Sequence, residues 1–125
     1  NGHKIAHYKI LKDVPVLIRD TVAGAVTDNY IHAIIINGGT GISKRDTTFE
    51  AVDSLLEKRL EGFGELFRYL SFQEIGSAAI MSRASAGVCR GKIIISIPGS
   101  ESAVKLAMEK LILPELGHII WEINR

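Results

Sequence analysis

The spacing of hydrophobic positions changes along the chain and divides it into strand-like and helix-like segments. Residues 5–11 mix β-branched and aromatic residues, which predicts a strand. A helix is expected after Asp13, because Asp favours the cap position and the following Pro15 is tolerated in a first turn. Its apolar stripe recurs at helical spacing through residues 17–26. Residues 32–36 form a short apolar run, typical of a parallel strand covered on both faces.

The middle of the chain predicts helices. Thr47 and Glu50 have capping-box spacing, so a helix is expected to begin there. Its apolar face extends to Leu60, Glu50 faces water, and the glycines of residues 62–64 are expected to break it. Two further helices are expected over residues 66–70 and 76–86.

The last third predicts a hairpin followed by helices. Residues 87–90 and 92–97 resemble two strands joined at Arg90-Gly91. A loop follows, and helical spacing resumes over residues 103–112. Pro114 is expected to interrupt this helix and leave a last one over residues 115–123.

The alternation of strands and helices predicts an α/β fold: a three-layer, open, mostly parallel sheet with helices on both faces. A length of 125 residues with 46% hydrophobic residues predicts one domain, residues 1–125. Ligands bind such sheets at the carboxyl ends of the strands. The loops after residues 11, 36 and 97 are therefore expected to share one functional edge.

The second of these loops is rich in glycine. Gly38, Gly39, Thr40 and Gly41 follow the apolar strand, and glycines let backbone amides approach an anion. The alternative is a plain tight turn. The loop is neither a Walker loop nor a dinucleotide-binding loop, because it lacks their spacing.

Charged and polar residues lie on the same predicted edge. Asp46 and Asp13 are candidate ligands for Mg²⁺, which takes oxygen ligands, and the alternative for each is helix capping. Arg45 is a candidate phosphate ligand. The other candidate ligand-binding residues are Ser82, Arg83, Pro98, Gly99 and Ser100, of which Ser100 is also expected to cap its helix.

Composition narrows the class of partner. The formal net charge is +1, so nucleic acid is not an expected partner. The single cysteine excludes a disulfide within the chain and fits a reducing compartment. No apolar run approaches the length of a membrane span and no signal-peptide pattern is visible. A cytoplasmic protein with a small-molecule ligand is expected.

Residues 37–48 read Asn-Gly-Gly-Thr-Gly-Ile-Ser-Lys-Arg-Asp-Thr-Thr. They resemble the TGGTG-x-x-x-RD-x-T signature of molybdenum cofactor biosynthesis proteins of the MoaB/MogA type. The resemblance extends from Gly2 to about Leu116, and residues 62–84 are closer to the MoaB branch. Further motifs agree in order: Glu61-Gly62-Phe63-Gly64-Glu65-Leu66-Phe67-Arg68, Phe72-Gln73-Glu74-Ile75-Gly76-Ser77, Met81-Ser82-Arg83-Ala84 and Ile97-Pro98-Gly99-Ser100.

The resemblance implies a molybdopterin-binding fold and an adenylyltransferase. The terminal phosphate of molybdopterin would attack the α-phosphate of Mg-ATP, and adenylylated molybdopterin and pyrophosphate would be formed. Asp46 corresponds to the catalytic Asp of the family's Arg-Asp motif. Asp13 corresponds to the Asp of a Pro-Asp pair that the family often has before the helix, but Lys12 replaces the Pro here. The glycine loop and residues 98–100 correspond to ligand-binding loops.

The resemblance also implies a homo-oligomer, either a trimer or a hexamer. A catalytically weak protein of the MoaB branch, which binds molybdopterin or a partner, is the alternative function. A nucleotide pyrophosphatase of the competence-damage type is more remote, since Arg45-Asp46 argues against it.

The chain departs from the family pattern in two places. The family's initial strand–helix unit is absent from these residues, so an open sheet edge is expected, and Glu101 stands where the family often has Pro.

Overall fold

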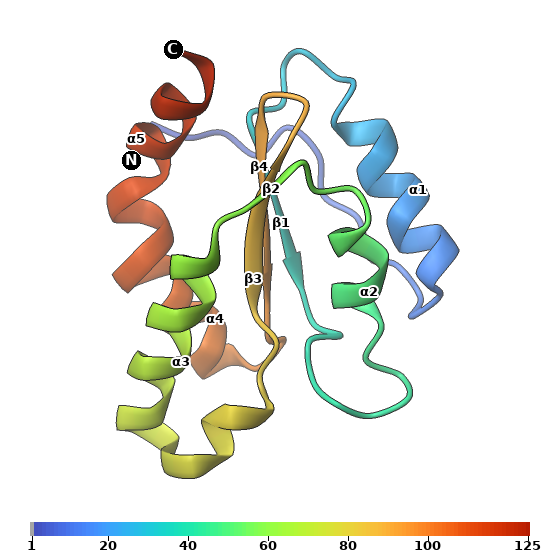
Figure 1. Cartoon of the computed structure of the whole chain (residues 1–125). Coiled ribbons are helices and arrows are strands. Elements are labelled where there is room, and N and C mark those ends of the chain that lie inside the picture. The colour runs from blue at the N-terminus through green and yellow to red at the C-terminus, as the bar shows by residue number, and fades with distance from the viewer. Residues whose placement is uncertain (1) are drawn as a thin grey trace.

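A four-stranded sheet separates two layers of helices in the computed structural model, which describes residues 2–125 (Figure 1). The elements in chain order are α1 (Pro15–Ala25), β1 (Ala33–Asn37), α2 (Thr48–Asp53), β2 (Lys58–Arg59), α3 (Glu61–Ile75), the 3₁₀ helix η1 (Gly76–Met81), β3 (Ser85–Cys89), β4 (Lys92–Ile97), α4 (Glu101–Ala107), the π-helix η2 (Met108–Ile112) and α5 (Leu113–Asn124). The strand order is β1-β4-β3-β2. The predicted three-layer α/β fold is confirmed.

The pairing of the strands makes the sheet mixed. β1 runs parallel to β4, with Ala33 opposite Ile93 and Asn37 opposite Ile97. β3 is antiparallel to both β4 and β2. The prediction of a mostly parallel sheet is therefore wrong for residues 2–125, where one strand pair of three is parallel. The predicted hairpin is present: Arg90 and Gly91 connect β3 to β4 with φ values of 52° and 80°, which a tight two-residue hairpin turn requires. Because β1 and β4 are parallel, their carboxyl ends lie side by side.

Strand β4 is buried on both faces and divides the core in two. Ile93, Ile95 and Ile97 pack into a cluster with α3, α4 and α5. Ile94 points to the opposite face and packs against α1 and α2. Successive strand residues point to opposite faces, so one continuous apolar strand serves both layers. Figure 1 shows α1 and α2 on one side of the sheet and α3, α4 and α5 on the other.

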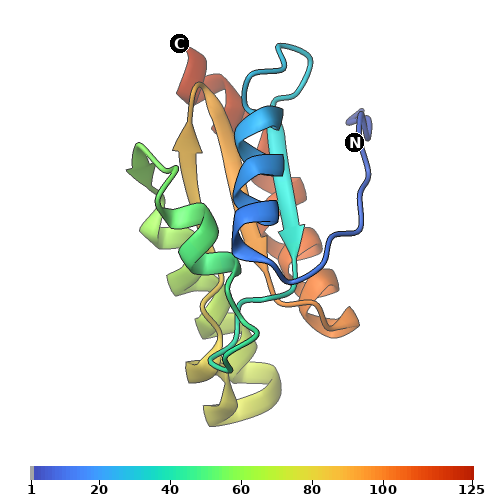
Figure 2. The same ribbon diagram turned by 90° about the vertical axis from the view of Figure 1, so that its right-hand side faces the viewer.

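The strand expected over residues 5–11 does not form. Ile5, Tyr8 and Ile10 are 80–85% exposed. Figure 2 shows this segment running outside the sheet before the chain turns into α1. Among the strands in residues 2–125, β1 pairs only with β4, so residues 5–11 add no strand to its outer edge. The free edge of β1 agrees with the open edge expected from the sequence.

The helix predicted from Thr47 to Leu60 is wrong in its second half. α2 ends at Asp53, and residues 58–59 pair with β3 instead. The glycine-containing residues 62–64 lie inside α3 rather than breaking a helix. Packing accounts for Gly64, since a Cβ there would lie 2.7 Å from the carbonyl oxygen of Ala84. Close approach of α3 to the sheet thus offsets the low helix propensity of glycine.

Three further predictions of helix structure are wrong. Residues 76–86 form η1 and then extend into β3, because Gly76 leaves α3 with a φ of 74°. Pro114 does not separate the helix over residues 103–112 from the last one, because α4, η2 and α5 follow one another directly. It lies in the first turn of α5, after the π-turn of η2, where its missing N–H is tolerated. Val14, not Asp13, is the N-cap of α1, and no side chain caps it.

Candidate functional site

Two loops meet where β1 and β4 end. The backbone amide of Gly38 donates a hydrogen bond of 2.8 Å to the carbonyl oxygen of Ile97. The loops also touch at Gly99, where a Cβ would lie 3.4 Å from the Cα of Gly38. The parallel pairing of β1 with β4 thus brings the glycine loop beside residues 98–100.

The glycine loop adopts a backbone that only glycine tolerates well. Gly38 and Gly39 have φ values of 94° and 71°. Thr48 closes the loop: its hydroxyl donates to the carbonyl oxygen of Gly38 at 2.9 Å and its amide to that of Gly39 at 3.1 Å. A Cβ at Gly39 would overlap the Thr48 hydroxyl oxygen. The helix start at Thr48 is therefore part of the loop's support.

Asp46 is held against the same loop. The amide and hydroxyl of Ser43 donate to Asp46 Oδ2 at 2.9 and 2.8 Å. These hydrogen bonds lower the pKa of the carboxyl group, so it is ionised at neutral pH. Gly41 lies so close that a Cβ there would be 2.7 Å from Oδ2. The capping box predicted for the next residue, Thr47, is absent, since its buried hydroxyl has no partner within residues 2–125.

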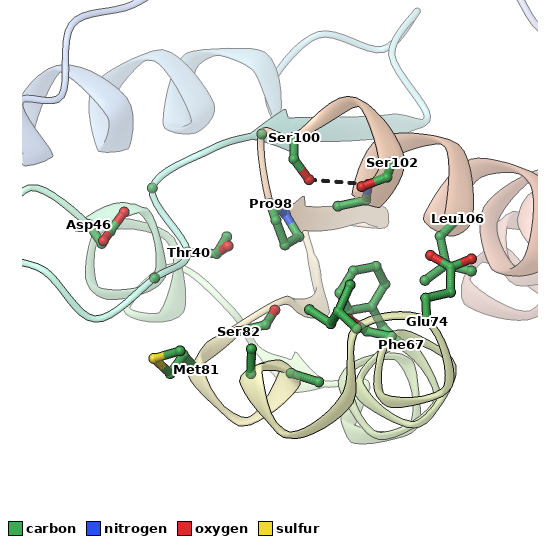
Figure 3. A pocket seen from close by; sticks show the side chains of 18 residues that line it. Thr40, Asp46, Phe67, Glu74, Met81, Ser82, Pro98, Ser100, Ser102 and Leu106 are labelled. Atoms are coloured by element: carbon green, nitrogen blue, oxygen red, sulfur yellow. Dashed lines mark hydrogen bonds between the residues drawn. The ribbon is translucent and has the colours of Figure 1, made fainter.

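These loops form one side of a pocket whose other side is built by α3, η1 and α4 (Figure 3). Its volume is about 270 Å³, near the lower end of the roughly 300–1,000 Å³ typical of small-molecule sites. Phe67 and Leu106 supply apolar surface opposite the loops, and Ser71, Glu74 and Ser102 add polar groups. The pocket therefore joins a polar, glycine-rich wall to an apolar floor.

Most of the predicted site residues line this pocket: Gly39, Thr40, Gly41, Asp46, Ser82, Pro98, Gly99 and Ser100. Ser100 also caps α4 as expected, because its hydroxyl accepts from the Ala103 amide at 3.3 Å. Arg83 lines an adjoining hollow together with Glu50 and Lys44. Arg45 and Asp13 are exposed and line neither space.

Three residues that shape the site were not predicted to do so from the sequence. Thr48 stands inside the glycine-loop motif but has no catalytic chemistry that would single it out. Phe67 lines the pocket from α3 while being only 1% exposed. Glu50 is exposed as expected, but its ion pair with Arg83, 33 residues away, was not predicted. Each depends on a contact between segments that sequence periodicity cannot reveal.

Two features are absent from residues 2–125: a ready-made cluster of metal ligands and a membrane-spanning helix. No group of three or more His, Cys, Asp or Glu side chains in these residues is placed to hold a metal ion. No helix in this part of the chain combines the length and apolar character that crossing a membrane requires.

Comparison with known proteins relates this geometry to a family. The family described as "Probable molybdopterin binding domain" matches residues 1–118. Molybdenum cofactor biosynthesis protein B of Bacillus cereus is 50% identical over 125 residues, which are 99% of this chain and 74% of that protein. The protein of the same name from Halalkalibacterium halodurans is 56% identical over 123 residues, 98% of this chain and 72% of that one. A crystal structure of molybdenum cofactor biosynthesis protein B superposes with a TM-score of 0.95 at 51% identity, covering 99% of this chain and 78% of that one.

Proposed function

The chain belongs to the molybdopterin-binding family of molybdenum cofactor biosynthesis proteins, and we propose that it transfers the adenylyl group of ATP to molybdopterin. One observation carries the proposal: an ionised Asp46 and a glycine loop share a pocket with an apolar floor. Phosphoryl-type transfer demands positioning and charge neutralisation more than a nucleophilic side chain. The glycine loop would position a phosphate, and Asp46 offers a carboxylate for a counter-ion that would neutralise it.

The two sides of the pocket suit the two parts of a phosphorylated pterin. The terminal phosphate would be bound by backbone amides of the glycine loop and of Gly99 and Ser100, with Ser82 and Ser100 as hydroxyl donors. The flat pterin ring would lie toward Phe67 and Leu106. Arg45 would neutralise charge on the nucleotide, since it is exposed beside the loop.

The proposed reaction needs no redox partner. An oxygen of the terminal phosphate of molybdopterin forms a bond to the α-phosphorus of ATP. The bond from that phosphorus to the bridging oxygen of the β-phosphate breaks, and pyrophosphate leaves with the electron pair. Asp46 would fix the reacting phosphates through their counter-ion rather than attack them.

Mg²⁺ is the counter-ion that fits these residues. It is usually held by one or two carboxylates together with substrate phosphates. Asp46 meets this requirement, because its carboxylate is ionised and both Ser43 hydrogen bonds go to Oδ2 rather than Oδ1. Asp13 is proposed as a second carboxylate; it is exposed in the turn before α1. When bound, the ion would neutralise negative charge on the phosphates of ATP.

We also propose that residues 1–125 act as one domain in a cytoplasmic trimer or hexamer. The exposed apolar side chains of α3 and η1 support subunit packing: Leu66, Tyr69, Phe72, Ile75 and Ile80 are 54–81% exposed. Native mass spectrometry would measure the assembly. A monomer at micromolar concentration would contradict this part of the proposal.

The experiment that tests the activity follows the α-phosphate. The chain is incubated with molybdopterin, Mg²⁺ and ATP labelled at the α-phosphate. Label recovered in the pterin, with one pyrophosphate per transfer, is the expected result. Tight binding of molybdopterin without label transfer would instead support a protein that only binds the pterin. Asp13→Asn tests the second carboxylate and should lower turnover less than Asp46→Asn.

A further inference from the structure

Arg83 lies in the link between η1 and β3 and reaches across to the glycine loop. Its backbone amide donates to the carbonyl oxygen of Thr40 at 2.8 Å. Its side chain continues in the same direction: Nε donates to the Gly41 carbonyl at 2.8 Å and Nη2 to the Asp46 carbonyl at 2.7 Å. One residue thus binds the backbone of the loop at three places.

The Arg83 guanidinium is itself fixed by α2. Glu50 accepts hydrogen bonds from both terminal nitrogens of the guanidinium. Nη2 donates to Oε1 at 3.2 Å, and Nη1 donates to Oε2. The ring of Phe49 lies 5.4 Å below the guanidinium carbon, within the range of a cation–π contact. The side chain is therefore held in one orientation by a carboxylate and an aromatic ring from the helix that follows Asp46.

We infer that Arg83 is a positioning residue, which holds Asp46 and the glycine loop in the geometry for phosphate binding without contacting the substrate. This rests on the proposed function. Asp46 is fixed twice: Arg83 holds its carbonyl oxygen and Ser43 holds its carboxylate. Removing the first support would let the carboxylate shift, and misplacement by about 1 Å can cost about 100-fold in rate.

The distribution of hydrogen-bond donors distinguishes this role from phosphate binding. The single N–H of Nε goes to Gly41, and the two of Nη2 go to Asp46 and Glu50. Nη1 adds a bond to Glu50. A Lys side chain has one nitrogen and cannot reproduce this planar fork, although it would still neutralise a phosphate. If Arg83 holds the loop, Arg83→Lys should impair the protein; if Arg83 only neutralises a phosphate, Arg83→Lys should preserve its function.

Arg59 provides a matched control. Its guanidinium also pairs with a carboxylate of α2, through two hydrogen bonds of 2.7 Å to Asp53. It lines neither the pocket nor the adjoining hollow and has no hydrogen bond to the glycine loop. Arg59→Gln removes an ion pair of the same kind away from the site.

Hydrogen exchange and kinetics test the inference together. Amide exchange of peptides covering residues 38–48 is compared for the full chain and for Arg83→Gln, Arg83→Lys and Arg59→Gln. We expect both Arg83 variants to speed exchange of this loop about tenfold or more, and Arg59→Gln to leave it unchanged. For the labelled-ATP reaction, both Arg83 variants should lower kcat about tenfold or more and change KM for ATP much less.

Unchanged loop exchange in a folded Arg83→Gln protein would overturn the inference. So would an Arg83→Lys protein with normal kcat, or a raised KM for ATP with normal kcat, because these would mark a phosphate ligand. If Arg83→Gln does not fold, Glu50→Gln gives the test, with an intermediate rise in loop exchange expected and no rise contradicting. Failure of the native chain to transfer label would refute the proposed function alone, since loop exchange does not depend on turnover.

Discussion

Replacing Gly39 with Ala tests how the glycine loop is supported. At a φ of 71° an alanine is strained, which costs about 1–2 kcal/mol of unfolding free energy. Gly38→Ala is the matched control: its φ is 94°, and no heavy atom lies within 4 Å of the new Cβ. Both variants therefore place an alanine at a positive φ, and they differ in what the new methyl group meets.

At Gly39 the methyl group would overlap the hydroxyl of Thr48 and lie 3.0 Å from its Cβ. Thr48 would have to rotate and give up its hydrogen bond to the Gly38 carbonyl, which is worth about 0.5–1.5 kcal/mol. A distorted rotamer adds a cost of similar size, about 0.5–1.5 kcal/mol. Gly39→Ala should thus be about 1–3 kcal/mol less stable than Gly38→Ala.

Urea unfolding followed by far-UV circular dichroism measures this difference, provided that the two variants give equal m-values. Adding Thr48→Ala should make Gly39→Ala less costly than it is with Thr48 present, because the overlapping hydroxyl is then gone. Equal stabilities for Gly38→Ala and Gly39→Ala, or a larger loss at Gly38, would refute the supporting role of Thr48.

Three further predictions concern the pocket floor, the sheet and the Arg83 ion pair. Phe67→Ala should lower the unfolding free energy by about 3–5 kcal/mol in urea, because this ring is 1% exposed in the core; a loss below about 1 kcal/mol would contradict its burial. Ser96→Ala should be neutral or stabilise by up to about 1 kcal/mol in the same assay, since its buried hydroxyl has no partner within residues 2–125, and a clear loss would point to a missed hydrogen bond. The hydrogen bond from Arg83 lowers the pKa of Glu50 in the folded protein. The ion pair therefore stabilises the fold fully above the pKa of an unfolded Glu, about 4.3, and this contribution is lost as the pH falls through the lower folded pKa. Glu50→Gln should therefore cost about 0.2–1 kcal/mol at pH 7 and progressively less below about pH 4.3, whereas a cost independent of pH would exclude the ion pair as its cause.

The sequence predicted best where one segment determines its own structure. The apolar run before Asn37 and the one before Pro98 formed adjacent strands, and Gly38 and Gly39 after the first run adopted positive φ values. Pattern and turn chemistry both act locally there. The residues that follow these strands therefore met at one edge, as expected.

Prediction failed where a distant segment decides. Residues 5–11 have the side chains of a strand but pair with no strand of residues 2–125. Residues 58–59 pair with β3 instead of continuing a helix, which no helical pattern could indicate. The ion pair of Glu50 was not predicted, because periodicity considers only its own helix, whereas its partner, Arg83, follows η1. Motif and spacing thus identified the loop at the site but not the contacts that hold it.

The measurement that tests the central claim most directly is the turnover of Asp46→Asn. Asparagine retains the size of the side chain and an oxygen that can accept the Ser43 hydrogen bonds, but it lacks the charge. With labelled ATP, Mg²⁺ and molybdopterin, we expect kcat to fall about 100-fold or more while the assembly and the unfolding transition stay close to those of the native chain. Normal turnover by a folded Asp46→Asn protein would contradict the assignment of this pocket as an adenylyl-transfer site.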